Sequence, residues 1–125
     1  MRKLPYENEY FDKVICLWSS FNHLLTQKEQ VSCLNEVYRI LKIKGKFIVE
    51  LPNAGTKEAK KIISEKGKGE NSRIVTDKIA ETDVTNYWHD KNTLTRISEE
   101  SKFKKFKTKI TKIGDRERLI WLLEK

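Results

Sequence analysis

The chain has 125 residues, of which 38% are hydrophobic and 35% are charged, and its formal net charge is +8. This composition is typical of one globular domain and excludes an intrinsically disordered chain. No window approaches the roughly 18 to 20 consecutive apolar residues that a membrane-spanning helix requires. The first residues contain no apolar signal core, so we expect a cytoplasmic protein without membrane contacts.

The first predicted element is a strand with five consecutive apolar residues, Val14 to Trp18. Such an unbroken run is typical of a strand that is covered on both faces and lies inside a parallel sheet. Only about a dozen residues precede it, which is too few for a crossover and another parallel strand. We therefore expect one edge of this strand to lack a partner from its own chain.

A helix and a second strand are predicted next. Thr26 and Glu29 have the spacing of a capping box, and apolar residues then recur at helical spacing as far as Leu41. Gly45 is expected to adopt the left-handed conformation that ends the helix. Residues 47–51, apolar except for Glu50, form the next predicted strand. The order strand, helix, strand predicts a parallel pair with a right-handed crossover.

The middle of the chain gives weaker signals. A short helix is expected over 56–66, and residues 73–76 and 84–88 have some strand character. Asn92 or Thr93 can cap a further helix.

The last two predicted strands form an antiparallel hairpin. In the first of them apolar residues alternate with lysines over 105–110, and in the second residues 119–123 are all apolar, with Gly114 and Asp115 at the turn. Lysines protect the edge of a sheet, whereas an all-apolar strand belongs inside it. The predicted strand order is therefore first strand, second strand, final strand and, outermost, the lysine strand.

The cysteines and the lysine-rich segments indicate neither a metal site nor a nucleic-acid-binding motif. Cys16 and Cys33 are expected to be buried free thiols, and no cluster of residues has metal-ligand spacing. The lysines concentrate in 57–68 and 102–112 without a nucleic-acid-binding motif. They favour a solvated lysine face over a nucleic-acid surface.

Several segments of the chain form a recognisable series. They are residues 4–15 (LPYENEYFDKVI), 17–24 (LWSSFNHL), 36–42 (EVYRILK) and 45–47 (GKF), followed by a last helix within 92–106 and a terminal hairpin. In this order they resemble segments of class I S-adenosylmethionine-dependent methyltransferases of the small-molecule (type 11) kind. The resemblance implies an α/β fold, the C-terminal half of a Rossmann-like sheet with about four main strands and flanking helices.

The cofactor-binding half of that family is not recognised in this sequence. The five glycines include no G-x-G pair that follows a strand and opens a helix. We therefore expect residues 1–125 to be a single partial methyltransferase domain. Its implied cofactor is S-adenosylmethionine, bound weakly or not at all by this chain alone, and its implied substrate is a small-molecule acceptor.

The resemblance and the strand ends together indicate candidate site residues. The methionine end of the cofactor would lie against the residues that follow the first strand, Leu17, Trp18 and Ser19. The acceptor would lie near residues from three later segments, Asn22, His23, Asn53, Tyr87 and Trp88. No catalytic base is assigned.

Three functions remain open at this point. The chain could be part of a methyltransferase whose complementary N-terminal half joins along the Val14–Trp18 edge. It could be a catalytically inactive relic that forms a homodimer through the same edge. A basic nucleic-acid-binding module is the third alternative.

Overall fold

The structure is a computed structural model and describes residues 3–125. In chain order its elements are β1 (Phe11–Cys16), the 3-10 helix η1 (Ser20–His23), α1 (Gln27–Ile40), β2 (Leu41–Pro52), α2 (Lys57–Lys66), the 3-10 helix η2 (Glu70–Ser72), β3 (Ile74–Ile79), β4 (Thr82–Tyr87), α3 (Lys91–Glu100), β5 (Lys105–Ile113) and β6 (Arg116–Glu124).

The main sheet has four strands in the order β1-β2-β6-β5, as the sequence predicts. β1 and β2 are parallel, with Val14 beside Phe47 and Cys16 beside Val49, whereas β6 is antiparallel to both β2 and β5. β3 and β4 form a separate antiparallel pair. The expected α/β fold with a parallel pair and a terminal hairpin is confirmed.

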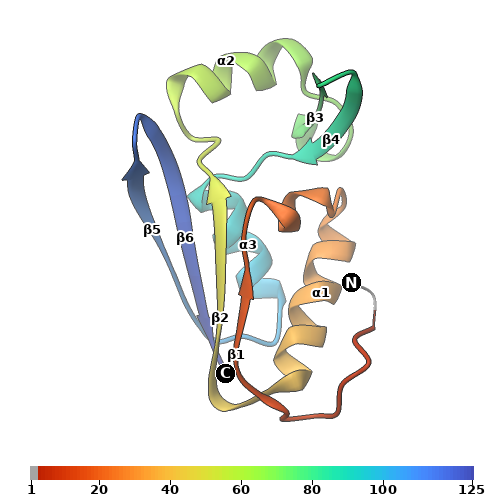
Figure 1. Cartoon of the computed structure of the whole chain (residues 1–125), viewed down its shortest axis with the longest axis vertical. Coiled ribbons are helices and arrows are strands. Elements are labelled where there is room, and N and C mark those ends of the chain that lie inside the picture. The colour runs from red at the N-terminus through yellow and green to blue at the C-terminus, as the bar shows by residue number, and fades with distance from the viewer. Residues whose placement is uncertain (1–2) are drawn as a thin grey trace.

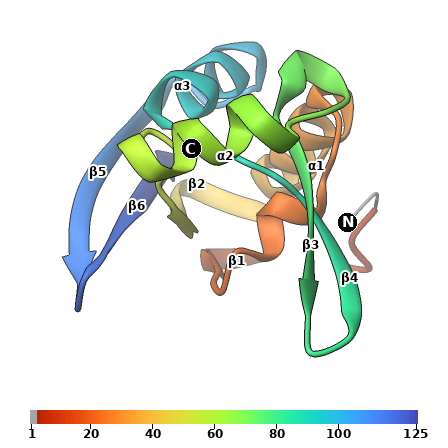
Figure 2. The ribbon, with the colours of Figure 1, turned by 90° about the horizontal axis from the view of Figure 1, so that it is seen from above.

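Helices α1 and α3 cover the same face of the main sheet, and the core lies between them and the strands (Figures 1 and 2). Alternate residues of β2 and β6 point into this core. Phe47, Val49 and Leu51 are buried from β2, and Trp121 is buried from β6. The Trp121 indole Nε1–H donates to Ser98 Oγ of α3 at 3.0 Å, which ties the helix to the sheet.

The other face of the sheet is covered by no helix of the described residues, which corrects the expectation that the first strand is covered on both faces. Ile15 has 59% of its surface exposed. It pairs with Ile48, and Ile48 pairs with Leu122, so the three side chains form an aliphatic row across the open face. β1 also has no strand partner on its outer side among the residues described. The unpaired edge is as predicted.

The start of α1 agrees with the sequence prediction and its end does not. The Thr26 hydroxyl accepts from the Glu29 N–H and the Glu29 carboxylate accepts from the Thr26 N–H, which is the expected capping box. At the other end β2 begins directly at Leu41. The left-handed residue is Lys44, with φ 68°, and not Gly45. Gly45 is required for space, because a Cβ there would lie 2.7 Å from the Lys42 carbonyl oxygen.

Three further predictions are corrected. β1 ends at Cys16 instead of Trp18, because Trp18 and Ser19 have left-handed backbone conformations that turn the chain away from the strand direction. The cap of α3 is Asp90, since its carboxylate accepts from the Thr93 N–H and leaves no capping role for Asn92. Ile110 is 45% exposed and does not belong to a buried face, as the outer part of the β5–β6 hairpin extends past the helices (Figure 1).

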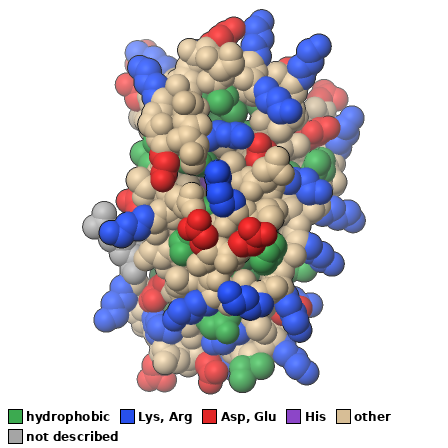
Figure 3. All heavy atoms as spheres, turned by 180° about the vertical axis from the view of Figure 1, so that it is seen from behind, with side chains coloured by type: hydrophobic (Ala, Val, Ile, Leu, Met, Phe, Trp, Pro, Cys, Tyr) green, Lys and Arg blue, Asp and Glu red, His purple; other side chains and the backbone are tan. Residues whose placement is uncertain are grey.

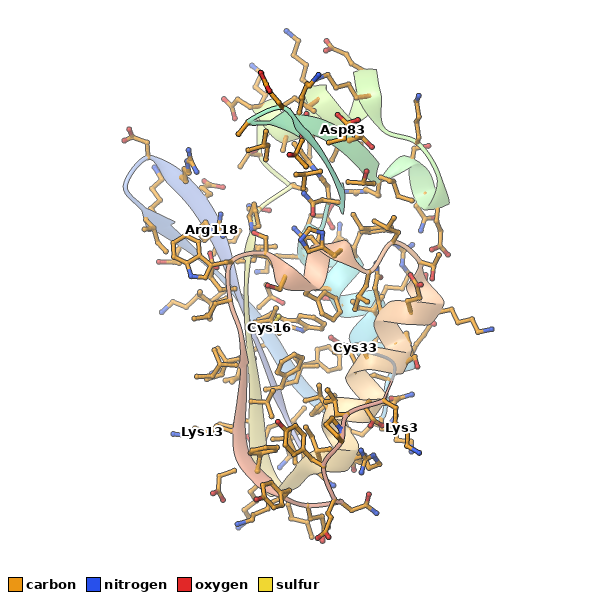
Figure 4. All side chains as sticks on the ribbon, turned by 45° about the vertical axis from the view of Figure 1, so that its right-hand side comes forward. Lys3, Lys13, Cys16, Cys33, Asp83 and Arg118 are labelled. Atoms are coloured by element: carbon orange, nitrogen blue, oxygen red, sulfur yellow. The ribbon has the colours of Figure 1, made fainter. Side chains whose placement is uncertain are left out.

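Cys16 of β1 and Cys33 of α1 both point into the core between the sheet and α1 (Figure 4). They are free thiols, as predicted, and burial raises the pKa of both. No helix formed by residues 3–125 is long and apolar enough to cross a membrane.

Substitutions at Lys44 and Gly45 test the roles assigned to these neighbouring residues, a positive φ at Lys44 and lack of space at Gly45. Gly45→Ala should lower the free energy of unfolding by about 1–3 kcal/mol, because the added methyl group has no space. Lys44→Gly should leave stability unchanged or raise it by up to about 1 kcal/mol, since glycine adopts a positive φ without strain. Urea unfolding measures both. A destabilised Lys44→Gly beside an unchanged Gly45→Ala would contradict the assignment.

Candidate functional site

The candidate site lies where β1 and β2 end. Because the two strands are parallel, both carboxyl ends meet at one edge of the sheet, and open α/β sheets bind ligands at that edge. The segment after β1 leads into η1, and the segment after β2 leads through Asn53 and Ala54 to α2. The β3–β4 hairpin and α2 lie over this end of the sheet (Figures 1 and 2). The Ala54 N–H donates to the His89 carbonyl at 2.8 Å, which fixes the end of β2 against the segment after β4.

The turn after β1 is held in an uncommon conformation. Trp18 and Ser19 both have left-handed backbones, with φ 57° and 62°, which non-glycine residues seldom adopt. The Glu50 carboxylate at the end of β2 accepts from the Trp18 N–H at 3.2 Å and also from the Arg118 guanidinium. Arg118 further contacts Ser19 Oγ at 3.4 Å. Figure 4 shows Arg118 beside the end of β1. The Glu50–Arg118 pair therefore fixes a turn that local backbone preferences would not favour.

A pocket of about 190 Å³ opens between this turn and the β3–β4 hairpin. We call it the acceptor pocket, after the methyl acceptor that the sequence analysis expects near several of its residues. Its lining comes from η1, the end of β2, α2 and the hairpin. The lining residues are Ser19, Asn22, Pro52, Asn53, Ala54, Ala59, Asp77, Asn86 and Trp88.

Four of the eight residues predicted from the sequence meet in this pocket, namely Ser19, Asn22, Asn53 and Trp88. They differ in what their polar atoms do. Asn53 Oδ1 accepts from the Gly55 N–H at 2.8 Å, and its Nδ2 donates to the Glu117 carboxylate at 3.1 Å. By contrast, Asn22 is only 4% exposed and its Oδ1 has no hydrogen-bond partner.

The other four predicted residues lie outside the acceptor pocket. Trp18 is 87% exposed at the surface. Tyr87 is buried, with its ring centroid 4.7 Å from that of His89 and its hydroxyl accepting from Asn71. Leu17 and His23 line a second, larger groove.

This second groove, the edge groove, runs along β1 and has a volume of about 570 Å³. Its walls come from the N-terminal segment, β1, η1 and α1. Most of them are apolar, including Leu4, Phe11, Val14, Leu24, Val37 and Ile40. It follows the same edge of β1 that lacks a strand partner.

His89 is a buried residue that the sequence analysis did not select as a site residue. Its Nδ1 lies 3.0 Å from Thr93 Oγ1, which already donates its proton to the Asp90 carbonyl. His89 Nδ1 must therefore be the donor, and Nε2 is an acceptor without a partner. Burial lowers the pKa of His89 to about 3, so the ring is neutral.

Asp77, Asn86 and the Glu50–Arg118 pair were also missed. Asp77 and Asn86 belong to the hairpin, whose alternation was too weak to assign faces. The Glu50–Arg118 contact joins residues that are 68 positions apart, and no local pattern signals such a pair.

No group of His, Cys, Asp or Glu within residues 3–125 could hold a metal ion. Figure 3 shows Lys and Arg side chains spread over one face of the molecule with Asp and Glu among them, so no single basic patch dominates that face.

Comparison with known proteins gives a consistent identification of the fold. Residues 1–49 match the family described as "Methyltransferase domain". No curated protein sequence matches the chain. A solved SAM-dependent methyltransferase from Methanosarcina mazei superimposes with a TM-score of 0.79 at 15% identity, covering 99% of this chain and 63% of that one.

Two further solved structures agree. A protein from Pyrococcus horikoshii has a TM-score of 0.69 at 25% identity, and the match covers 99% of this chain and 56% of the Pyrococcus chain. The CcbJ methyltransferase from Streptomyces caelestis has a TM-score of 0.70 at 11% identity, covering 98% and 64%. The chain thus spans less than two thirds of the length of these structures. The predicted class I methyltransferase fold is confirmed.

The first site prediction concerns the turn after β1. Glu50→Ala removes the acceptor of the Trp18 N–H and the partner of Arg118, so amide hydrogen exchange at residues 17–19 should become faster. A charged hydrogen bond of this kind contributes about 1.5–3 kcal/mol. Glu50→Gln keeps an acceptor oxygen and should show a smaller change. Equal exchange rates in the wild type and Glu50→Ala would contradict a role for Glu50 in fixing the turn.

The second prediction concerns pH. The unfolded chain protonates the His89 ring below its ordinary pKa of 6.5, whereas the folded chain does so only near 3. The free energy of unfolding should therefore fall as the pH drops from 6.5 toward 3. NMR should show His89 ring signals that stay constant between pH 7 and pH 5. In His89→Gln, urea unfolding should show a weaker loss of stability over this range. Ring signals that titrate near pH 6.5 would refute the buried neutral state.

Proposed function

We propose, from the premise that this chain has the fold of class I S-adenosylmethionine-dependent methyltransferases, that it forms the acceptor-binding part of an enzyme that methylates a small molecule. The acceptor pocket carries this proposal. It lies at the carboxyl ends of the parallel strands and brings together four residues selected from the sequence. The match of residues 1–49 to a methyltransferase domain supports it independently.

The turn after β1 is the part of this chain that would hold the cofactor. S-adenosylmethionine supplies an electrophilic methyl group on a positively charged sulfur. Leu17, Trp18 and Ser19 would contact its methionine end. The turn suits this role because its backbone is fixed by Glu50 and Arg118. Ser19 belongs both to the turn and to the acceptor pocket, so it would lie between the two ligands.

Catalysis in this pocket would depend on orientation and on exclusion of water. Trp88 and the β3–β4 hairpin would cover the acceptor, and Asn22 would orient it. Asp77 is the single ionisable side chain among the described residues that line the pocket. An acceptor that loses a proton would therefore release it to Asp77 or to water.

We also propose that a complementary portion with a parallel strand joins β1 and supplies the remaining cofactor contacts. Three features support this. The outer edge of β1 is unpaired, the edge groove beside it is apolar, and the aliphatic row of Ile15, Ile48 and Leu122 is uncovered. The matched solved structures are also longer than this chain. A strand added at β1 and a layer packed on the aliphatic row would bury all three.

Cofactor titration tests whether the site needs this portion. Isothermal titration of the isolated chain with S-adenosylmethionine should show no binding at micromolar concentration. The melting temperature should also not change at millimolar cofactor, because only a ligand that binds the folded state stabilises it. Saturable micromolar binding would contradict the need for a complementary portion.

The homodimer is the second candidate, since two copies could pair through their open β1 edges. For the isolated chain we expect light scattering to show dimers at micromolar concentration. Ile15→Lys should shift them to monomers. Ile79→Lys is the matched control, because Ile79 is equally exposed, at 59%, but lies in β3. A monomeric wild type, or equal effects of the two substitutions, would exclude pairing at β1.

A further inference from the structure

The lining of the acceptor pocket indicates the chemical class of its ligand. This inference rests on the proposed function, because it treats the pocket as the place where the methyl acceptor binds. The pocket, of about 190 Å³, is smaller than the roughly 300–1,000 Å³ of sites for drug-sized ligands. Its ligand is therefore small.

Two of the lining side chains carry acceptor oxygens that lack a donor. Asn22 Oδ1 and Asn86 Oδ1 are both buried without a hydrogen-bond partner. Buried polar atoms are nearly always paired in folded proteins, and each unpaired one costs about 1–3 kcal/mol. The two asparagines come from η1 and β4, segments that are in contact. A ligand that donates hydrogen bonds to both would remove this cost.

The charge of the lining selects the same kind of ligand. Asp77 contributes a carboxylate, and no Lys, Arg or His of the described chain lines the pocket, although the whole chain carries a net charge of +8. The nearest counter-charge recorded for Asp77 is Lys66, whose Nζ lies 3.7 Å from Oδ1. Both side chains are substantially exposed, at 58% and 41%, so this ion pair is weak and Asp77 can exchange partners.

Most of the remaining lining is apolar or aromatic. Pro52, Ala54 and Ala59 contribute apolar surface, and Trp88 contributes an indole. The polar Ser19 and Asn53 also line the pocket, but both already have hydrogen-bond partners within the chain. An indole face attracts a cation as well as an apolar ring. A ligand with a compact apolar body and a nitrogen bearing N–H groups therefore matches the unpaired oxygens, the carboxylate and the apolar part of the lining.

We propose that the acceptor pocket binds a small primary or secondary amine. Its N–H groups donate to the oxygens of Asn22, Asn86 and Asp77, and its apolar body packs against Trp88. A primary ammonium group offers three donors. After it gives one proton to Asp77, the neutral amine keeps two donors and has the lone pair that accepts a methyl group. An alcohol offers only one donor and a carboxylate none. A carboxylate would also be repelled by Asp77. The pocket should therefore discriminate among ligands of equal size by their polar group.

Three ligands with the same ring and different polar groups test this on the full chain, namely benzylamine, benzyl alcohol and benzoate. Binding is followed by NMR of the Trp88 indole and the asparagine amides, without S-adenosylmethionine. Benzylamine should shift these signals and bind at least about ten times more tightly than benzyl alcohol. Benzoate should not bind. Tighter or equal binding of benzoate, or no shift with benzylamine, would overturn the proposal.

Variants locate the binding and separate it from folding. Asn86→Leu removes an unpaired acceptor at similar volume and should weaken benzylamine binding about tenfold or more. Asp77→Asn should weaken it as well, and remains informative if Asn86→Leu does not fold. Asp83→Asn is the matched control, because Asp83 is an exposed acid of the same hairpin that does not line the pocket (Figure 4). Unchanged affinity in Asp77→Asn and Asn86→Leu would place the amine elsewhere.

The cofactor is absent from this titration, so its outcome does not depend on cofactor binding. Benzylamine that binds to a chain without methyl-transfer activity in any assembly would refute the proposed function and leave the amine site. Methyl transfer to an alcohol or a carboxylate, with no amine binding, would refute the amine site and leave the proposed function.

Discussion

Parallel pairing of β1 with β2, in the register that sets Cys16 beside Val49, brings the ends of both strands to one edge of the sheet. Glu50 then lies close enough to the turn after β1 to accept the Trp18 N–H, and Arg118 reaches the same carboxylate from β6. Shifting the register by one residue would turn each side chain of β1 to the opposite face. The turn, the pocket beside it and the placement of Ser19 all depend on this pairing.

The packing of the sheet is asymmetric, and this asymmetry links the fold to the proposed function. One face holds the core, with Trp121 and Phe47 under α1 and α3. The opposite face presents the aliphatic row of Ile15, Ile48 and Leu122. An apolar row of this kind gains free energy when it is removed from water. The same strands therefore stabilise this chain through one face and leave apolar side chains exposed on the other, where the proposed complementary portion would pack.

The sequence predicted the order of all four main strands because burial and edge protection leave clear patterns. Residues 119–123 are entirely apolar and lie inside the sheet, and the lysine strand lies outermost, as expected. The capping box at Thr26 also followed from local chemistry. The prediction failed at Gly45, because a glycine after a helix can be required either for a positive φ or for lack of space. Here Gly45 is required because a Cβ would clash, and Lys44 takes the positive φ.

The site was predictable only where it follows the strand ends. Ser19, Asn22 and Asn53 follow the predicted parallel strands within a few residues, so their position at one edge could be inferred. Asp77 and Asn86 could not be inferred in this way, because they reach the pocket from a hairpin with little alternation. Tyr87 and Trp88 are adjacent in sequence, yet one packs against His89 and the other lines the pocket. Successive residues of a strand point to opposite sides.

The two outer strands of the main sheet differ in how readily they would accept a further strand. β5 exposes Lys105, Lys107 and Lys109 along its length, whereas β1 is open. Lysines on an outer strand oppose the addition of a further chain. In the main sheet β1 is therefore the border that can accept a further strand, and the lysine strand is the border that opposes one. If two chains paired through β1 as proposed, both receptive borders would be used and a third chain would meet only lysine strands of the two main sheets.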